Sequence, residues 1–154
     1  MRLATVEPFS THLPLSTRLL YELGDPNSTL RATTDRSGPA VLIHAGGEID
    51  ACNEHTWRRL LEEAAAFVTA PGPFVVDVSG LDFMGCCAFA ALSDEAQRCR
   101  DRGVELRLVG PQPIVARIVE ACGLSRLLLV YRTVDAALDT SKAGSLSLVT
   151  RRPG

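Results

Sequence analysis

The feature that most constrains this chain is a regular alternation, through its middle portion, between short apolar runs and longer stretches of helical periodicity. Five apolar runs are candidates for β-strands: residues 30–34, 40–45, 74–78, 104–109 and 127–130. Strands that alternate with helices are typical of a mostly parallel sheet whose strands are connected by crossover helices. We therefore predict an α/β fold with a mixed, mostly parallel sheet of about five strands, flanked by four or so helices.

The first two apolar runs are connected differently from the others. Only residues 35–39 separate them, and this spacer contains Gly38 and Pro39. A turn-rich connection of this length suits an antiparallel hairpin, whereas a parallel crossover needs about a dozen residues or more. The first strand pair is therefore predicted to be antiparallel.

Helical periodicity is clearest after Asn53, where apolar residues recur every three or four positions and charged residues lie between them. The apolar positions of this stretch are Trp57, Leu60, Leu61, Ala64, Ala65 and Val68. A second helix is predicted to begin at residues 85–87, and a third is opened by Pro111 or Pro113. Cys99 and Cys122 fall on the inner faces of these two helices. Shorter helices are predicted at residues 15–24 and 134–138.

Length and composition fit one compact domain. The chain has 154 residues, of which 46% are hydrophobic and 22% are charged. That composition provides enough apolar side chains for a core without disulfides. We predict a domain at residues 28–140, preceded by an N-terminal extension at residues 1–27 and followed by a flexible tail at residues 141–154.

Charge and cysteine content exclude several classes of function. A net charge of −2 gives no positive field for direct binding of nucleic acid, and no apolar stretch reaches the ~18 residues of a membrane helix. Five cysteines, an odd number, do not fit a secreted disulfide framework, so we expect a reducing, cytoplasmic environment. The chain also lacks a phosphate-binding glycine loop and a Cys-x-x-Cys pair, so we predict no cofactor and no metal.

Loops at the carboxyl ends of parallel strands gather at one edge of a sheet, where the sites of α/β proteins usually form. Three such loops are predicted, at residues 46–52, 82–87 and 110–113. If the second and third strands are neighbours, Asp50 and Cys52 lie on the same edge as Cys86 and Cys87. Asp50 and Asp82 also have a structural explanation, because each can cap a helix or accept N–H bonds within its loop. This edge is the candidate functional surface.

The cysteines at this edge allow two interpretations. At the start of a helix, Cys87 meets unpaired backbone N–H groups that favour its thiolate, whereas its apolar neighbours indicate a packed, inert thiol. A disulfide between adjacent residues closes a strained ring, so Cys52 is the better disulfide partner for Cys86 or Cys87. His55, through a tertiary contact, would be the base of a Cys-His nucleophile pair.

Four segments stand in the order and spacing of a known family: Gly47–Asp50, Val76–Met84, Val104–Gly110 and Cys122–Leu124. Together they resemble the STAS domain of bacterial anti-sigma factor antagonists, over residues 28–140. The resemblance implies a small sheet flanked by helices, which agrees with the order of elements predicted above. It also implies a non-enzymatic protein that binds an anti-sigma factor of kinase type and so releases a sigma factor.

The resemblance breaks down at one turn. In that family the turn between strand and helix reads Asp-Ser-Ser-Gly, and the kinase-type anti-sigma factor phosphorylates a serine there. The matching positions here are Gly85, Cys86, Cys87 and Ala88. Cys86 and Cys87 replace the two serines, and the resemblance places Cys87 at the position of the second serine, the phosphoacceptor, without a serine hydroxyl. The acidic Asp50 of the first loop does match the family.

The docking edge implied by the resemblance consists of Asp50, Met84, Gly85, Cys86 and Cys87. Without the usual phosphoserine, we expect partner binding to be controlled by oxidation of Cys86 and Cys87, or by phosphorylation of Ser79 or Ser93. Two other hypotheses stay open. One is a thiol-based redox sensor or enzyme acting through Cys87, and the other is a degenerate domain that serves as a scaffold or binds a small apolar ligand.

Overall fold

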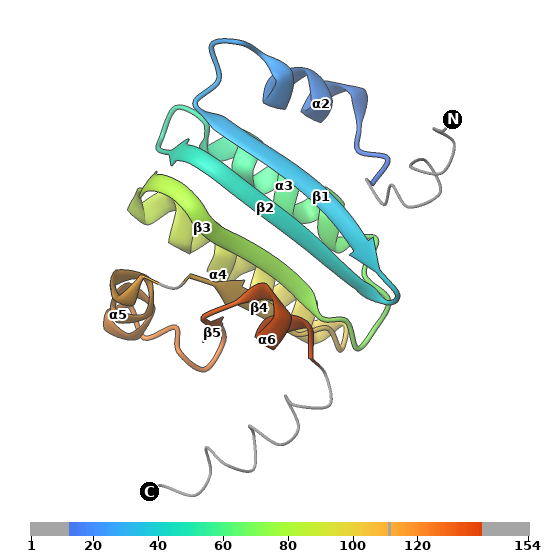
Figure 1. Cartoon of the computed structure of the whole chain (residues 1–154), viewed down its shortest axis with the longest axis vertical. Helices are drawn as coiled ribbons and strands as arrows, with labels where there is room; N and C mark the ends of the chain where they lie inside the picture. The colour runs from blue at the N-terminus through green and yellow to red at the C-terminus, as the bar shows by residue number, and fades with distance from the viewer. Residues whose placement is uncertain (1–12, 111, 140–154) are drawn as a thin grey trace, which may run out of the picture.

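The computed structural model describes residues 13–110 and 112–139 and contains one five-stranded sheet (Figure 1). Its strands, in spatial as well as chain order, are β1 (Leu30–Ser37), β2 (Ala40–Ile49), β3 (Phe74–Met84), β4 (Leu106–Val109) and β5 (Leu129–Tyr131). β1 pairs antiparallel with β2, and every other pair is parallel. The predicted α/β fold and its antiparallel first pair are confirmed.

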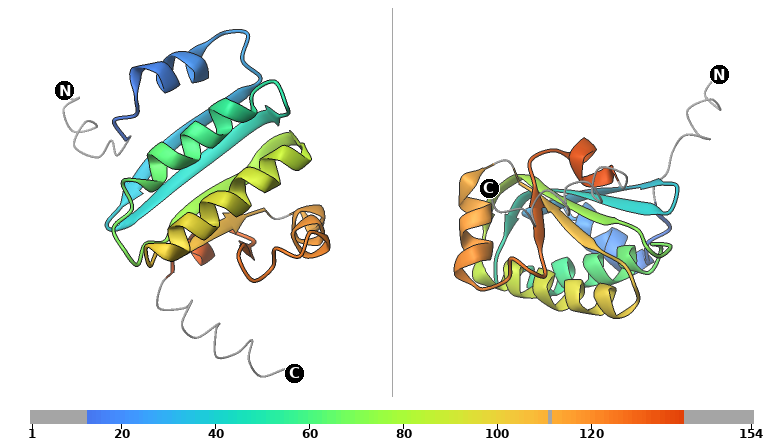
Figure 2. Two further views of the ribbon diagram at one scale, coloured as in Figure 1. Left: turned by 180° about the vertical axis from the view of Figure 1, so that it is seen from behind. Right: turned by 90° about the horizontal axis from the view of Figure 1, so that it is seen from below.

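Helices cover both faces of this sheet. They are α2 (Thr17–Gly24), α3 (Glu54–Ala65), α4 (Cys86–Asp101), α5 (Pro113–Ala121) and α6 (Val134–Leu138). α3 and α4 lie side by side across one face, whereas the short α6 lies against the other (Figure 2). No helix among the described residues is long and apolar enough to cross a membrane.

The alternation of side chains along the strands divides the core between these two faces. On β2, Val41 and Ile43 belong to the large cluster beneath α3 and α4, while Leu42 belongs to a small cluster with Ala137 of α6. Trp57 of α3 is fully buried in the large cluster. Apolar side chains on both faces of the central strands explain why their sequences read as nearly continuous apolar runs.

The strands differ from the predicted bounds, most of all at their carboxyl ends. β2 continues to Ile49 and β3 to Met84, through glycines and charged residues that were expected to form loops. Two bulges accommodate these residues in the ladder. At Gly47 φ is +89°, and a Cβ there would overlap the carbonyl oxygen of Thr29. Glycine at this position therefore lets the strand continue past the bulge.

Smaller shifts affect the other strands. β1 extends to Ser37. β4 starts only at Leu106, because the backbone N–H of Val104 still bonds to the carbonyl of Cys99 and closes the end of α4. β5 starts at Leu129, after a turn in which the N–H of Leu128 bonds to the carbonyl of Leu124.

The described residues before β1, from Leu13 onward, pack on the same core as the sheet. Leu19 of α2 is fully buried there. Ser16 donates its backbone N–H and its hydroxyl to Glu63 of α3, at 2.7 and 2.6 Å, and Glu22 accepts from the Thr56 hydroxyl at 2.9 Å. Whether residues 1–27 form a separate extension stays a prediction. Residues 1–12, Pro111 and the expected tail at 141–154 lie outside the described residues.

Candidate functional site

The ends of β2 and β3 bring two of the predicted loops together. Ile49 and Met84 are partners in the parallel ladder, and the next residue, Gly85, donates its N–H to the carbonyl of Ile49 at 2.9 Å. The chain leaves the two strands side by side, with Asp50 after one and Gly85 after the other. The structure therefore places Asp50 and the turn at residues 84–87 on one edge of the sheet, as expected for adjacent parallel strands.

Asp50 organises the loop after β2. Its Oδ1 accepts the N–H of Cys52 at 2.9 Å, and its own N–H donates to Asn53 Oδ1 at 3.0 Å. The side-chain Nδ2 of Asn53 donates hydrogen bonds to the carbonyl oxygen of Glu48 and to the hydroxyl of Thr29. Asp50 thus has the predicted loop role rather than a capping role. The contribution of Asn53 was missed, since an Asn before a helix usually signals only a cap.

The turn after β3 starts α4 without a side-chain cap. Gly85 is the N-cap residue, in extended conformation, and makes no side-chain cap hydrogen bond. The predicted cap Asp82 instead lies within β3 and is exposed. Phe83 beside it is 53% exposed, although an aromatic residue at the end of a buried strand is usually expected in the core.

The two cysteines of the turn differ in accessibility. Cys86 is exposed and Cys87 is half-buried. Burial, followed by the negative charge of Glu54, raises the pKa of the Cys87 thiol, with a smaller contribution from Asp50. Hydrogen bonds from backbone N–H groups at the helix start lower this pKa, but their effect is smaller than that of burial and the carboxylates. The expectation that the helix start favours a thiolate at Cys87 is therefore wrong.

The remaining cysteines separate into buried and exposed thiols, and all five are free. Cys99 is buried, as predicted, and desolvation raises its pKa to about 11. Cys122, predicted to face inward, is exposed. It is the C-cap of α5, where the chain turns away at Gly123 with φ +73°. Cys52 is exposed on the Asp50 loop, and Cys52, Cys86 and Cys87 are all free, so the predicted disulfide between Cys52 and the turn is not formed in this structure.

The two histidines within the described residues, His44 and His55, are paired with groups other than a thiol. His55 Nε2 lies 3.3 Å from the Thr56 hydroxyl and 3.9 Å from a carboxylate oxygen of Glu22. His44 pairs with Asp77 at 2.9 Å, and the same carboxylate accepts from the Ser79 hydroxyl at 2.6 Å. The predicted Cys-His pair with His55 is therefore not formed. Within residues 13–110 and 112–139, no cluster of three metal-ligating side chains occurs.

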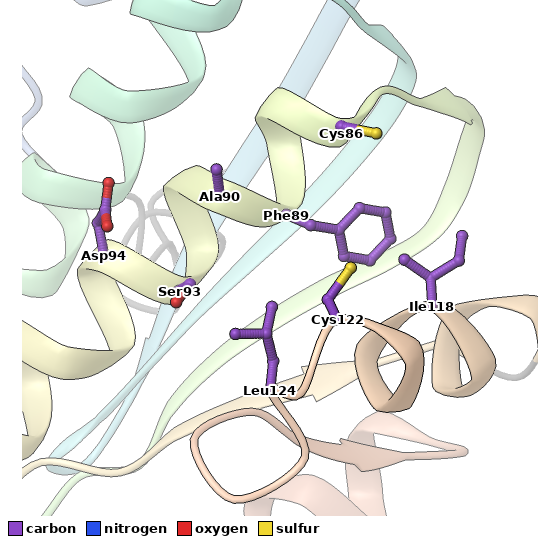
Figure 3. A pocket seen from close by; sticks show the side chains of 8 residues that line it. All are labelled: Cys86, Phe89, Ala90, Ser93, Asp94, Ile118, Cys122 and Leu124. Atoms are coloured by element: carbon purple, nitrogen blue, oxygen red, sulfur yellow. The ribbon is translucent and has the colours of Figure 1, made fainter.

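A pocket of about 270 Å³ lies between α4 and α5, next to the turn (Figure 3). Its lining consists of Cys86, Phe89, Ala90, Ser93, Asp94, Ile118, Cys122 and Leu124. Cys86 and Cys122 thus line the same cavity, whereas Cys52 and Cys87 do not. The sequence pattern gave no signal for this pairing, because α5 reaches α4 only through the fold.

These features define a class of protein. The fold is a small α/β domain with an exposed turn at a sheet edge, and that edge offers neither a base beside a thiol nor, among the described residues, a metal cluster. The STAS domain family model matches residues 31–137. The chain belongs to the STAS domain family, among the anti-sigma factor antagonists, which are non-enzymatic regulators of transcription.

Two relatives come from Mycobacterium tuberculosis. One, Rv2638, is named as a candidate anti-anti-sigma factor and is 72% identical over 144 residues, which cover 94% of this chain and 97% of that protein. The other is the anti-sigma-F factor antagonist RsfA, 54% identical over 115 residues, which cover 75% of this chain and 90% of RsfA.

Solved structures share the fold at lower sequence identity. An anti-sigma factor antagonist from Mycobacterium paratuberculosis matches with a TM-score of 0.64 and 22% identity, over 75% of this chain and 96% of that chain. Unphosphorylated SpoIIAA matches with a TM-score of 0.58 and 18% identity, over 73% of this chain and 96% of that chain. The fold is therefore the SpoIIAA-like fold.

Proposed function

We propose that this protein is an antagonist that binds a kinase-type anti-sigma factor and thereby releases a sigma factor. The main support is the hydrogen bond from the N–H of Gly85 to the carbonyl oxygen of Ile49, which holds the Asp50 loop and the turn side by side on one edge. The docking edge consists of Asp50, Met84, Gly85, Cys86 and Cys87. Exposed Phe83 extends this edge with an aromatic side chain of the kind that anchors interfaces. The names of two close relatives support the same role.

The proposed antagonist binds without serine phosphorylation at the usual position. Neither Cys86 nor Cys87 offers a serine hydroxyl, and Gly85 lacks the acidic side chain of the family motif. Ser79 is a poor substitute because its hydroxyl donates to Asp77 at 2.6 Å. Ser93 lies in the pocket wall.

Control at the thiols replaces phosphorylation in this proposal. Cys86 is exposed on the docking edge, so a change in its oxidation state alters the surface that a partner contacts. Cys87 is less suited to start such chemistry, because its raised pKa leaves less of the reactive thiolate.

The test compares two substitutions at one position. Cys87→Glu adds a carboxylate to a half-buried edge position where Glu54 and Asp50 already contribute negative charge. We expect it to weaken binding of the purified anti-sigma factor by about tenfold or more. Cys87→Ser, which keeps the size of the side chain, is expected to leave binding unchanged. Titration calorimetry measures both affinities.

A matched control places the same charge elsewhere on α4. Gln97→Glu changes an exposed residue far along the helix and is expected to leave the affinity unchanged. Thermal unfolding of each variant shows whether the fold is retained. Equal affinities for Cys87→Glu and Cys87→Ser would remove the turn from the interface, and absence of binding by the unmodified protein would reject the proposed function.

A further inference from the structure

The side of α4 that faces α5 borders an apolar cavity whose lining includes two thiols, those of Cys86 and Cys122. Phe89, Ile118 and Leu124 contribute apolar surface, and the exposed residues Cys86 and Cys122 contribute sulfur. In Figure 3 the side chain of Cys122 points from the end of α5 toward the ring of Phe89 on α4. Two accessible thiols therefore line one cavity.

The other three cysteines are less suited to react with this pair. Cys99 is buried, with a pKa raised to about 11, and Cys87 is half-buried, with a raised pKa. Cys52 is exposed but does not line the cavity. Because the thiolate is the attacking species in disulfide chemistry, burial that raises a pKa slows the reaction.

Few side chains of α5 are buried, namely those of Val115 and Val119. No hydrogen bond or ion pair joins α5 to α4 in the part of the chain that the structure describes. In the view of Figure 3 the ring of Phe89 stands between Cys86 and Cys122, whereas the Cα atoms of a disulfide are usually only about 4.4–6.8 Å apart. A bridge therefore requires α5 to move toward α4 and the Phe89 ring to shift.

We propose that Cys86 and Cys122 form a reversible disulfide across this cavity, with a hydroperoxide as the oxidant. The Cys86 thiolate attacks the terminal peroxide oxygen, the O–O bond breaks with loss of an alkoxide (hydroxide from hydrogen peroxide) that takes up a proton, and Cys86 becomes a sulfenic acid. The Cys122 thiolate then attacks that sulfur, and the S–O bond breaks with loss of hydroxide, which takes up a proton to form water. With hydrogen peroxide, two thiols lose two electrons and give one disulfide and two waters. A dithiol reductant reverses the reaction.

The disulfide changes the docking edge, and this consequence rests on the proposed function. Cys86 is the first residue of α4 and a member of the docking edge. Its sulfur is removed from the contact surface when the bridge forms, and α5 is drawn toward the turn. Oxidation is therefore expected to release the anti-sigma factor, so that the reduced protein is the active antagonist.

The chemical part is tested on the purified full chain without a partner. The protein is treated with hydrogen peroxide, digested under non-reducing conditions and analysed by mass spectrometry. We expect a Cys86–Cys122 linked peptide in the unmodified protein and in Cys52→Ser, and its loss in Cys86→Ser and in Cys122→Ser. The replaced side chains are exposed, so the variants retain the fold, which circular dichroism verifies. A dominant Cys52–Cys86 peptide, or oxidation without any linked peptide, would overturn the proposal.

The functional part compares the affinities of reduced and oxidised protein for the purified anti-sigma factor. We expect oxidation to weaken binding by about tenfold or more, with recovery after dithiothreitol, and no such change in Cys122→Ser. If the linked peptide forms while binding of the reduced and oxidised protein is equal, the disulfide stands and its role as a switch is rejected. If the reduced protein does not bind at all, the proposed function fails while the peptide result is unaffected.

Discussion

The two flanks of α4 contrast sharply. On the α3 flank, Trp57 donates its indole N–H to the carbonyl of Ala88 at 3.2 Å, Arg58 pairs with Asp94 at 2.8 Å, and Arg102 donates to the carbonyl of Ala65 at 3.1 Å. On the α5 flank a cavity replaces these contacts. One helix thus has a side fixed by burial and hydrogen bonds and a side that borders a cavity.

The difference follows from the side chains on each flank. The α3 flank includes a buried carboxylate, Glu95, which Arg98 neutralises at 2.8 Å. A buried charge is tolerated only with such a partner, so the pairing adds geometric constraint to the packing. The α5 flank presents the small side chains Ala90 and Ser93 to the cavity. Small residues leave space between helices that larger ones would fill.

The largest predicted effect is on the fixed flank. Trp57→Ala removes a fully buried indole and its hydrogen bond, and we expect it to lower the free energy of unfolding by about 3–5 kcal/mol. Ile118→Ala, at the half-buried cavity wall, is expected to cost only about 1 kcal/mol. Urea denaturation of both variants measures the difference. Equal losses would show that both flanks are packed alike.

An intermediate effect is expected from the buried thiol of α4. Desolvation raises the pKa of Cys99 from 9.0 to about 11. Below pH 9 the thiol is protonated in both the folded and the unfolded chain. Between pH 9 and 11 only the unfolded chain ionises, so the free energy of unfolding falls as pH rises, by at most about 1.4 kcal/mol per pH unit.

Cys99→Ala provides the comparison for this pH dependence. The variant lacks the thiol, so its free energy of unfolding is expected to fall less over the same pH range. Urea denaturation at several pH values measures the difference between the two curves. Parallel curves from pH 9 to 11 would show that the Cys99 thiol ionises equally in the folded and unfolded states.

The smallest predicted effect concerns the start of α4, where the two flanks meet. Gly85 has φ −72° and ψ 170°, which any residue adopts, and a Cβ there would lie 3.4 Å from the nearest atom, the carbonyl oxygen of Ile49. Gly85→Asp adds an acidic N-cap and is expected to raise the free energy of unfolding by about 0.5–1 kcal/mol. Gly85→Ala, which has no capping oxygen, should give no such gain. The same urea titrations settle whether the cap matters.

Several parts of the site were predictable because they depend on local signals. The parallel pairing of the second and third strands follows from the length and helicity of their connection, and it puts Asp50 beside the turn at residues 84–87. The continuation of β2 past Gly47 was not predictable, since glycine and charged residues usually mark a loop. It depends on the backbone of Thr29, which approaches Gly47 from another segment of the chain.

The sequence by itself determined the order of the elements, the antiparallel first pair and the two cysteines at the turn, because periodicity, connection length and residue identity are all local properties. Only the tertiary structure decided the environments of the thiols. The pKa of Cys87 is raised by burial and by a carboxylate of α3, and Cys122 meets the cavity beside Cys86 because α5 packs near α4. Both results depend on which segments the fold brings together, and burial and charge act through space rather than along the chain.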